Sequence, residues 1–308
     1  MSISTQVCPK AFVLGHPIKH SKSPLLHRAA YRAMELEMSY EALDTTEDQL
    51  GSVFDQQGAD RPVRGFSVTM PLKSAVKEYL DELTPFAQAV GVVNTVYWQS
   101  HEAGSVRAYG HNTDVSGIVN ALGQTGYTGP AVHPAIIGGG GTATAALAAL
   151  RCMGATSVTV YVRDPNRAGA VRAVADRLGV VLEFQQLTGF TMGYSLHDVV
   201  ICTLPSGAAD TLLQGAAEHP AGTLLDVSYD PWPSVLAAEW ETRNGSVTSG
   251  LEMLMYQAVD QVKLFTGHQL QQDLPRQDAV LRAMREAVGL PASDYVPQKI
   301  WEPSLLTI

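Results

Sequence analysis

Short apolar runs alternate with amphipathic helical patterns along nearly the whole chain. Runs of apolar and β-branched residues are typical of buried strands, and apolar residues recurring three and four positions apart are typical of helices. The pattern predicts strands at 11–14, 39–43, 65–70, 131–138, 157–162, 180–184, 198–205 and 223–229. It predicts helices at 24–36, 46–54, 71–82, 142–153, 166–178, 208–216, 251–265 and 275–288. Strands separated by helices of this length favour an α/β fold with a parallel sheet.

Composition and charge describe an ordinary globular chain and exclude two classes of partner. Of the 308 residues, 45% are hydrophobic and 17% are charged, which is typical of a globular protein. The net charge is −9 and no basic run occurs, so we expect no binding to nucleic acid. The most apolar stretch, 131–150, contains four consecutive glycines and is followed by Arg151, so we expect no membrane span.

The cysteines and the first ten residues bear on metal binding and location. Cys8, Cys152 and Cys202 are scattered, without a CxxC or Cys/His cluster. This distribution fits a reducing compartment and predicts no metal site. The opening segment MSISTQVCPK lacks the apolar core of a secretory signal. We therefore expect a cytoplasmic protein.

A glycine-rich loop indicates a dinucleotide site. The segment IIGGGGTATAALAAL at 136–150 follows a predicted strand and opens a predicted helix. Gly138, Gly140 and Ala143 fit G-x-G-x-x-A, a loop without Cβ atoms that lets a pyrophosphate approach N–H groups at a helix N-terminus. Because the loop occurs in the required strand–turn–helix context, it predicts dinucleotide binding.

The end of the next predicted strand bears on which dinucleotide is bound. Arg163 and Asp164 follow that strand directly. An arginine there accommodates the 2′-phosphate of NADP, whereas an acidic residue binds the ribose hydroxyl of NAD. Arg163 therefore favours NADP, and Asp164 leaves NAD open.

A lysine and an aspartate are candidates for proton transfer. Lys73 ends the segment GFSVTMPLK, which indicates a strand followed by a proline turn, and strand ends of this kind hold sites in open α/β sheets. Asp114 begins an amphipathic helical pattern. A solvated lysine and an ordinary helix N-terminal aspartate are the simpler interpretations. Moving a hydride between an alcohol carbon and nicotinamide also requires moving the hydroxyl proton, which a lysine beside a carboxylate can do.

The segment LGHPIKHSKSPLLH at 14–27 joins a predicted strand to a predicted helix. Ser23 before Pro24 is typical of a helix start, because serine caps free N–H groups and proline has none. That interpretation does not explain Ser21 or His16. Hydroxyls gathered where a strand meets a helix can instead bind a polar ligand.

Seven separated segments resemble the shikimate dehydrogenase family, whose members interconvert 3-dehydroshikimate and shikimate with NADP(H). They are GHPIKHSKSP (15–24), GFSVTMPLK (65–73), GVVNT (91–95), GHNTD (110–114), IGGGGTATA (137–145), DVSYDPWPS (226–234) and GLEMLMYQA (250–258). They follow the order and spacing of the family from residue 11 to about residue 265. The resemblance implies two domains: an α/β substrate domain with a parallel or mixed sheet, at 1–113 with 250–308, and a Rossmann-like NADP-binding domain at 114–249.

The resemblance also implies roles for the residues that match its motifs. Lys73 and Asp114 would be the catalytic pair, and Ser21 and Ser23 would bind the substrate carboxylate, with Tyr229 near it. The other implied residues are Thr69, Asn94 and Gln257 for the ring hydroxyls; Gly138, Gly140 and Gly141 for the pyrophosphate; Arg163 for the 2′-phosphate; Thr203 and Leu204 along the cofactor path; and Gly250 beside the nicotinamide. His16 and His20 receive no role.

The implied function is the reversible, NADP-dependent reduction of 3-dehydroshikimate to shikimate in aromatic amino acid biosynthesis, by a cytoplasmic monomer or homodimer. The nearest alternative is an NAD-dependent quinate/shikimate dehydrogenase of the same fold, which Asp164 favours and Arg163 disfavours. A non-catalytic dinucleotide-binding protein would need Lys73 and Asp114 only as structure. A methylene-tetrahydrofolate dehydrogenase would lack the two serines.

The sequence departs from the family pattern in four places. Ser67 stands where members commonly carry Asn, which we expect to alter a hydrogen bond near the cofactor or the substrate. Residues 162–164 replace the common Asn-Arg-Thr, and CTLP at 202–205 replaces a common Asn-containing stretch. Residues 290–308 extend beyond the resemblance, and their apolar side chains could dock on the body of the protein, dock on a second protomer or remain disordered. These side chains are Trp301, Leu305, Leu306 and Ile308.

Overall fold

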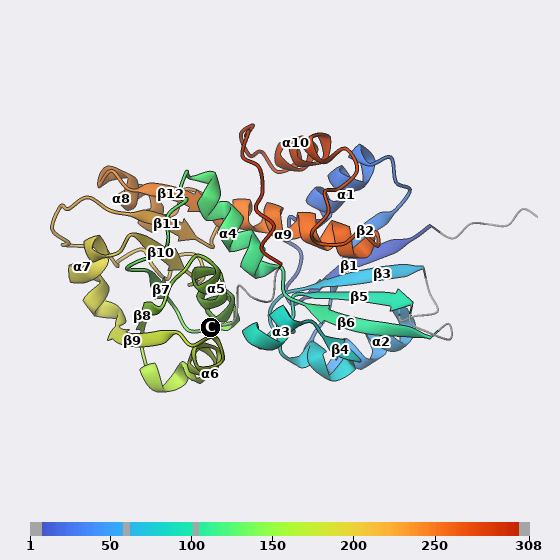
Figure 1. The fold of residues 1–308 in the computed structure, drawn as a ribbon, viewed down its shortest axis with the longest axis horizontal. Helices are drawn as coiled ribbons and strands as arrows, with labels where there is room; N and C mark the ends of the chain where they lie inside the picture. The colour runs from blue at the N-terminus through green and yellow to red at the C-terminus, as the bar shows by residue number, and fades with distance from the viewer. Residues whose placement is uncertain (1–7, 58–61, 101–104, 302–308) are drawn as a thin grey trace, which may run out of the picture. The chain divides into compact units, whose positions relative to one another are not determined.

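The computed structural model describes residues 8–57, 62–100 and 105–301, which form two compact units (Figure 1). Unit 1 comprises the described residues up to Gln88, Val92–Thr113 and Ala258–Ser293. Unit 2 comprises Ala89–Gly91, Asp114–Gln257 and the described residues from Asp294 onward. The helix α9 (Gly250–Phe265) contributes to both units, with the division inside it. Within the described ranges, no helix combines the length and apolar character that a membrane span requires.

Unit 1 is built on a mixed sheet of six strands. They are β1 (Lys10–Gly15), β2 (Ser39–Asp44), β3 (Val63–Val68), β4 (Glu82–Leu83), β5 (Thr95–Ser100) and β6 (Val106–His111), in the order β2-β1-β3-β5-β6-β4. β1, β2 and β3 are parallel, whereas β5 is antiparallel to both β3 and β6. The apolar pattern misses β5 and β6 because each has an exposed end that interrupts its run of buried residues.

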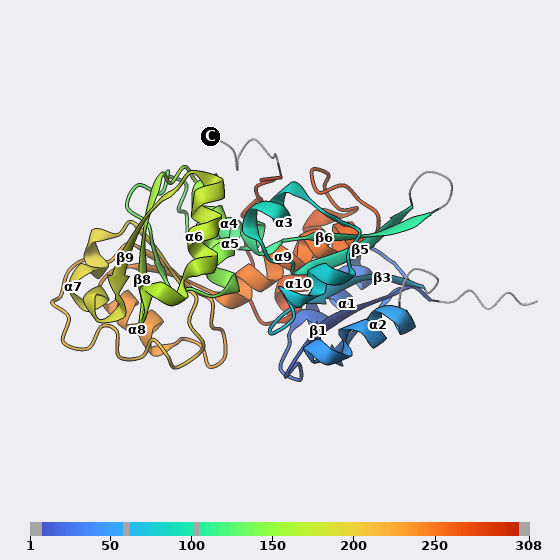
Figure 2. The same ribbon diagram turned by 90° about the horizontal axis from the view of Figure 1, so that it is seen from below.

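Different helices cover the two faces of this sheet. The helices of unit 1 are α1 (Ser23–Ala33), α2 (Leu50–Gln57), most of the short α3 (Pro85–Val90), the C-terminal part of α9 and α10 (Gln277–Ala287). Phe66 and Val68 of β3 pack in one core cluster with Leu50 at the start of α2. Gly65, which precedes Phe66 and so points to the opposite face, faces Phe265 of α9. α1 packs beside α10, as Figure 1 and Figure 2 show.

The helix predicted at 71–82 is wrong. The segment contains only a short 3-10 helix, Ala75–Tyr79, after a turn. The carbonyl of Lys73 accepts a hydrogen bond from the N–H of Val93 at 2.9 Å. Because the Lys73 carbonyl accepts from the loop that contains Val93, it does not accept the hydrogen bond that would begin an α-helix here.

Unit 2 is built on a parallel sheet of six strands. They are β7 (Ala135–Ile137), β8 (Ser157–Val162), β9 (Val181–Gln186), β10 (Val199–Cys202), β11 (Thr223–Asp226) and β12 (Ser246–Ser249), in the order β12-β11-β10-β7-β8-β9. All five pairings are parallel. Counted from β7, this is the strand order of doubly wound dinucleotide-binding sheets. The two sheets together confirm the predicted α/β fold class.

Helices also cover both faces of the second sheet. They are α4 (Asp114–Gln124), α5 (Gly141–Cys152), α6 (Gly169–Leu178), α7 (Phe190–Gly193) and α8 (Val235–Thr242). Phe190 of α7 and Trp240 of α8 belong to one core cluster with the strands, while α4, α5 and α6 pack side by side. The helix predicted at 208–216 is wrong, because Gly207 and Gly215 adopt positive φ angles and turns fill the segment.

The C-terminal segment docks on unit 2 without forming a helix or strand. Asn120 of α4 accepts hydrogen bonds from the hydroxyl of Tyr295 at 3.0 Å and the N–H of Gln298 at 2.6 Å. Its amide also donates to the carbonyl of Gln298 at 3.3 Å, and Trp301 is buried. Of the outcomes expected for this tail, docking on the body of the protein is confirmed as far as Trp301. Leu305, Leu306 and Ile308 lie outside the described residues.

Candidate active site

The two serines lie where β1 meets α1. The hydroxyl of Ser21 accepts a hydrogen bond from the N–H of Ser23 at 3.3 Å. The N-cap position of α1 is Lys22, and Ser23 is the first residue of the helix, so the interpretation of Ser23 as a helix cap is wrong. The buried Ser23 hydroxyl instead lies near that of Tyr40. Burial raises the pKa of Tyr40, and the hydroxyls of Ser67 and Ser23 oppose that rise.

The turn after β3 lies against the serine loop. The N–H of Thr69 donates to the carbonyl of Leu14 at 2.9 Å, and the N–H of His16 donates to the carbonyl of Met70 at 3.0 Å. A Cβ atom at Gly15 would overlap with the side chain of Thr69, so this close approach requires glycine. The turn holding Thr69 is thereby fixed beside the loop that carries the serines.

Asn94 joins the same region through backbone and side-chain bonds. Its carbonyl accepts from the N–H of Val68 at 2.7 Å, and its side chain is buried. The side-chain oxygen accepts from the N–H of Thr113 at 2.8 Å. Unit 1 therefore brings together five of the predicted residues at the carboxyl ends of β1 and β3. They are Ser21, Ser23, Thr69, Lys73 and Asn94.

Unit 2 holds the remaining predicted residues, beginning with Asp114 and Gln257. Asp114 is the buried first residue of α4. α4 and α9 approach closely at Gly117, where a Cβ atom would lie 2.7 Å from the carbonyl oxygen of Met253 and 3.1 Å from Cβ of Gln257. The Oε1 atom of Gln257 is buried and receives no hydrogen bond from any residue that the structure describes. A buried acceptor without a donor is costly, so this oxygen suits a ligand hydroxyl.

Tyr229 and Gly250 lie on either side of one close backbone contact. A Cβ atom at Gly250 would overlap with the carbonyl oxygen of Val227, and the Gly250 N–H donates to the carbonyl of Ser228 at 3.2 Å. The loop after β11 is thereby held against the start of α9. Burial and the nearby charge of Asp230 raise the pKa of the Tyr229 hydroxyl, which keeps it a hydrogen-bond donor at neutral pH.

A cavity of about 290 Å³ lies at the glycine loop of unit 2. Its lining includes Gly138, Gly140, Arg163 and Leu204. Gly138 has a φ of +113°, which only glycine adopts readily, and a Cβ atom at Gly140 would meet nothing within 4 Å. The backbone at Gly140 is therefore open to a ligand at the N-terminus of α5, as a pyrophosphate requires.

The other two cofactor residues predicted here border this loop. Gly141 is the first residue of α5. The hydroxyl of Thr203 donates to the carbonyl of Ile137 at 2.9 Å, and a Cβ atom at Gly138 would overlap with that hydroxyl. Thr203 thus holds the strand end that leads into the glycine turn, whereas Leu204 lines the cavity itself.

The charged residues of this cavity are two arginines and one aspartate. Arg167 lines it together with Arg163, and the sequence analysis missed Arg167. The spacing of Arg167, four positions after Arg163, could have indicated a second cation in the cofactor site. The carboxylate of Asp164 accepts from the N–H of Asn166 at 2.9 Å and caps the 3-10 helix that carries Arg167. The local balance is therefore positive, which fits a phosphate.

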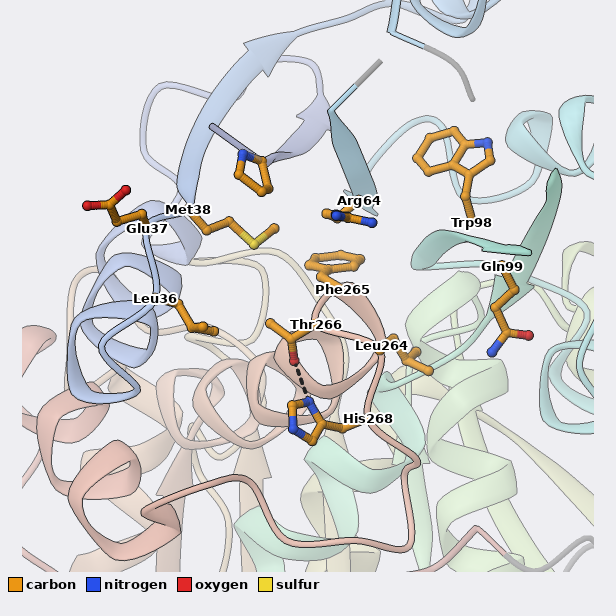
Figure 3. Close-up of a pocket in the computed structure, with 12 residues that line it drawn as sticks. Leu36, Glu37, Met38, Arg64, Trp98, Gln99, Leu264, Phe265, Thr266 and His268 are labelled. Carbon is orange, nitrogen blue, oxygen red and sulfur yellow. Dashed lines mark hydrogen bonds between the residues drawn. The ribbon is translucent and has the colours of Figure 1, made fainter. Parts of the chain in front are cut away.

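A second cavity, of about 310 Å³, lies in unit 1 (Figure 3). Arg64, Phe265 and His268 line it, and Figure 3 shows the 2.8 Å hydrogen bond between His268 and Thr266. It lies by Pro9, before β1, and Arg64, near the start of β3. The predicted site residues follow the opposite ends of these strands, so this cavity is separate from them. Among the described residues, no group of three or more His, Cys, Asp or Glu side chains could hold a metal ion.

Several known proteins are similar to this chain in sequence and in fold. The family model of the shikimate dehydrogenase substrate binding domain matches residues 13–96. A curated relative, the shikimate dehydrogenase (NADP(+)) of Methanothermobacter thermautotrophicus, is 33% identical over 279 residues, which cover 88% of this chain and 95% of that protein.

Two crystal structures are similar over nearly their whole length. The shikimate dehydrogenase of Mycobacterium tuberculosis gives a TM-score of 0.77 at 37% identity, covering 90% of this chain and 99% of that one. The shikimate 5-dehydrogenase of Thermus thermophilus, in complex with NADP(H) and shikimate, gives a TM-score of 0.69 at 31% identity, covering 91% and 99%.

Proposed function

Because this chain belongs to the shikimate dehydrogenase family, we propose that it interconverts 3-dehydroshikimate and shikimate with NADP(H). The observation that carries the proposal is the gathering of hydroxyl, amide and ammonium groups in unit 1, at the carboxyl ends of β1 and β3. Unit 1 then serves as the substrate domain and unit 2 as the NADP-binding domain. The expected bounds were 1–113 with 250–308 and 114–249, whereas unit 2 also includes residues 250–257 and the described residues from Asp294 onward.

The substrate is an anion with several ring hydroxyls, and the site offers groups for both. Ser21 and Ser23 bind the carboxylate with their hydroxyls near the N-terminus of α1, where the helix dipole favours negative charge. Tyr229 adds a hydroxyl near the same group. Thr69 and Asn94 bind ring hydroxyls, and the buried Oε1 of Gln257 accepts from one of them. A non-catalytic dinucleotide-binding protein, the alternative considered above, has no need for such an acceptor.

Lys73 and Asp114 move the proton. NADPH, when bound, supplies the hydride to the substrate carbonyl carbon. The ammonium of Lys73 donates a proton to the carbonyl oxygen as negative charge develops there, and in the reverse direction the amine accepts it. Asp114, the second member of the pair, supplies a carboxylate that assists this proton transfer.

Unit 2 binds the cofactor through backbone and cationic groups. Gly138, Gly140 and Gly141 hold the pyrophosphate, with Thr203 and Leu204 along its path and Gly250 beside the nicotinamide. Arg163 and Arg167 hold the 2′-phosphate. The NAD-dependent alternative depended on Asp164, whose carboxylate caps a backbone N–H in this structure. NADP is therefore the cofactor that this pocket suits.

The thiols support a proposal about the cellular setting. The three cysteines are free, as expected in a reducing cytoplasm, where we place the enzyme. Whether it works as a monomer or a homodimer stays a prediction.

The test is a set of initial rates with purified protein. Shikimate with NADP, shikimate with NAD, and quinate with each cofactor are compared through the absorbance of the reduced nicotinamide. We expect turnover with shikimate and NADP, and much less in the other three mixtures. Faster turnover with quinate and NAD would establish the alternative, and failure to turn over shikimate with either cofactor would refute the proposal.

A further inference from the structure

Five buried side chains of unit 1 form one continuous chain of hydrogen bonds. The hydroxyl of Tyr40 donates to Ser67 at 2.6 Å, and Ser67 donates to Oε1 of Gln261 at 2.7 Å. The amide nitrogen of Gln261 donates to Thr95 at 3.2 Å, and Thr95 donates to the side-chain oxygen of Asn94 at 2.7 Å. Each of these five side chains is at most 4% exposed. A buried network of this kind is well ordered only when every member is satisfied.

The backbone N–H of Thr113 fixes the direction of this chain. A backbone N–H can only donate, so the atom of Asn94 that faces it at 2.8 Å is the amide oxygen. Thr95 must therefore give its single hydrogen to Asn94 and accept from Gln261. Gln261 in turn must direct its nitrogen toward Thr95 and its oxygen the other way.

The far end of the chain follows from the same reasoning. The oxygen of Gln261 can only accept, so Ser67 must donate to it, and Tyr40 must then donate to Ser67. His27 also reaches that oxygen at 3.2 Å, and burial lowers the pKa of His27 to about 3, so the ring is neutral and donates from Nε2. With its hydrogen given to Ser67, the Tyr40 hydroxyl offers Ser23 an acceptor.

We propose that Gln261 is a positioning residue of the substrate site, which orients Asn94 at one end of this chain and Ser23 at the other. The inference rests on the proposed function, in which those two residues contact the substrate. The amide oxygen of Asn94 accepts from Thr113 and Thr95, and its nitrogen donates to the hydroxyl of Thr113 at 3.0 Å, so these bonds fix the orientation of the amide at the substrate site. Because Tyr40 gives its single hydrogen to Ser67, it faces Ser23 only as an acceptor, which favours one rotation of the Ser23 hydroxyl.

The first test replaces Gln261 and follows substrate and cofactor separately. In Gln261→Met the side chain keeps its length but neither accepts nor donates strongly. We expect KM for shikimate to rise about tenfold, while KM for NADP stays unchanged. Lys263→Met is the matched control. It breaks a buried 3.1 Å ion pair with Asp260 on the same helix, and neither residue belongs to the chain of hydrogen bonds. That variant should lose stability without a change in KM for shikimate.

Milder variants keep the test decisive if Gln261→Met does not fold. Thr95→Val removes one hydroxyl at constant shape, whereas Thr95→Ser retains it. Tyr40→Phe is paired with Tyr97→Phe, which removes the hydroxyl of another buried tyrosine on the same sheet. We expect raised KM for shikimate in Thr95→Val and Tyr40→Phe, and wild-type values in Thr95→Ser and Tyr97→Phe.

The outcomes separate this inference from the function on which it rests. Wild-type KM for shikimate in Gln261→Met, Thr95→Val and Tyr40→Phe, in an enzyme that turns over shikimate, would overturn the inference alone. Equal rises in the paired controls would also overturn it, because they would assign the effect to general loosening of unit 1. Absence of shikimate turnover by the wild-type protein would refute the proposed function as well.

Discussion

The hydroxyl of Ser67 donates a 2.7 Å hydrogen bond to Oε1 of Gln261, across 194 positions of sequence. Ser67 lies on β3 and Gln261 on α9, so the bond joins the early and late parts of unit 1. Serine can accept from Tyr40 and donate to Gln261 through one oxygen, which suits the middle of a directed chain. That Ser67, in place of the common Asn, alters a hydrogen bond near the substrate stays a prediction.

Replacing Lys73 should remove the proton donor. We expect Lys73→Ala to lower kcat by about 10²-fold or more, because a positioned acid contributes a factor of that order. Initial rates at saturating shikimate and NADP, measured across pH, give the comparison. Lys77→Ala, in the 3-10 helix that follows, is the control and should keep the wild-type kcat. A Lys73→Ala enzyme within a few-fold of wild type would rule out the acid–base role.

Removing the arginines of the cofactor cavity should weaken binding of NADP specifically. Arg163→Ala and Arg167→Ala should each raise KM for NADP about tenfold, because each removes a charge-assisted bond to the 2′-phosphate. KM for NAD, which lacks that phosphate, should barely change. Arg172→Ala is a suitable control, since Arg172 packs over Phe184 outside the cavity. Equal effects on both cofactors would place the two arginines elsewhere on the dinucleotide.

Truncating the side chain of Asn120 by substitution with alanine should release the C-terminal segment from α4. Asn120→Ala should lower the free energy of unfolding by about 2 kcal/mol, because it leaves the peptide of Gln298 without partners and costs Tyr295 a bond. Denaturant titration measures the change. Asn166→Ala, on the surface of the same unit, should stay near wild-type stability. A negligible change in Asn120→Ala would mean that the segment contributes little to the fold.

Burial of His27 should make stability depend on pH. Its pKa falls from 6.5 to about 3 in the folded protein, so the unfolded chain binds a proton that the folded chain does not. The stabilisation is complete above pH 6.5 and is lost as pH falls toward 3, at about 1.4 kcal/mol per pH unit. His27→Gln should flatten the curve of unfolding free energy against pH over that window. Parallel curves for the two proteins would contradict the prediction.

The sequence predicts those features that depend on neighbouring residues. Continuous apolar runs such as 157–162 and the glycine turn at Gly138 are local, and both are where the pattern places them. β12 and α8 escape prediction because β12 is only partly buried and α8 is short. The turns at 206–215 contain helix-forming residues, but positive φ angles at two glycines prevent a helix.

Only those residues of the candidate site that belong to local sequence motifs could be predicted. The Tyr40–Ser67–Gln261 contacts could not be predicted, because no local pattern relates β2, β3 and α9. The cap formed by Asp164 depends on the backbone of the following turn, which the sequence does not reveal. Its charge alone therefore suggested binding to the ribose of NAD. Arg167 likewise reaches the cavity through the shape of that turn.

Unit 1 takes its strands from the first 111 residues but two of its helices, α9 and α10, from residue 250 onward. The sheet of unit 2 lies wholly between these two parts of the sequence. A ribosome makes the chain from its N-terminus, so the nucleotide-binding sheet is complete before Gln261 has been synthesised. Under the proposed function, the substrate site of unit 1 is therefore completed last. A chain truncated after β12 retains the strands of both sheets, yet it lacks the helix that closes the chain of hydrogen bonds from Tyr40 to Asn94.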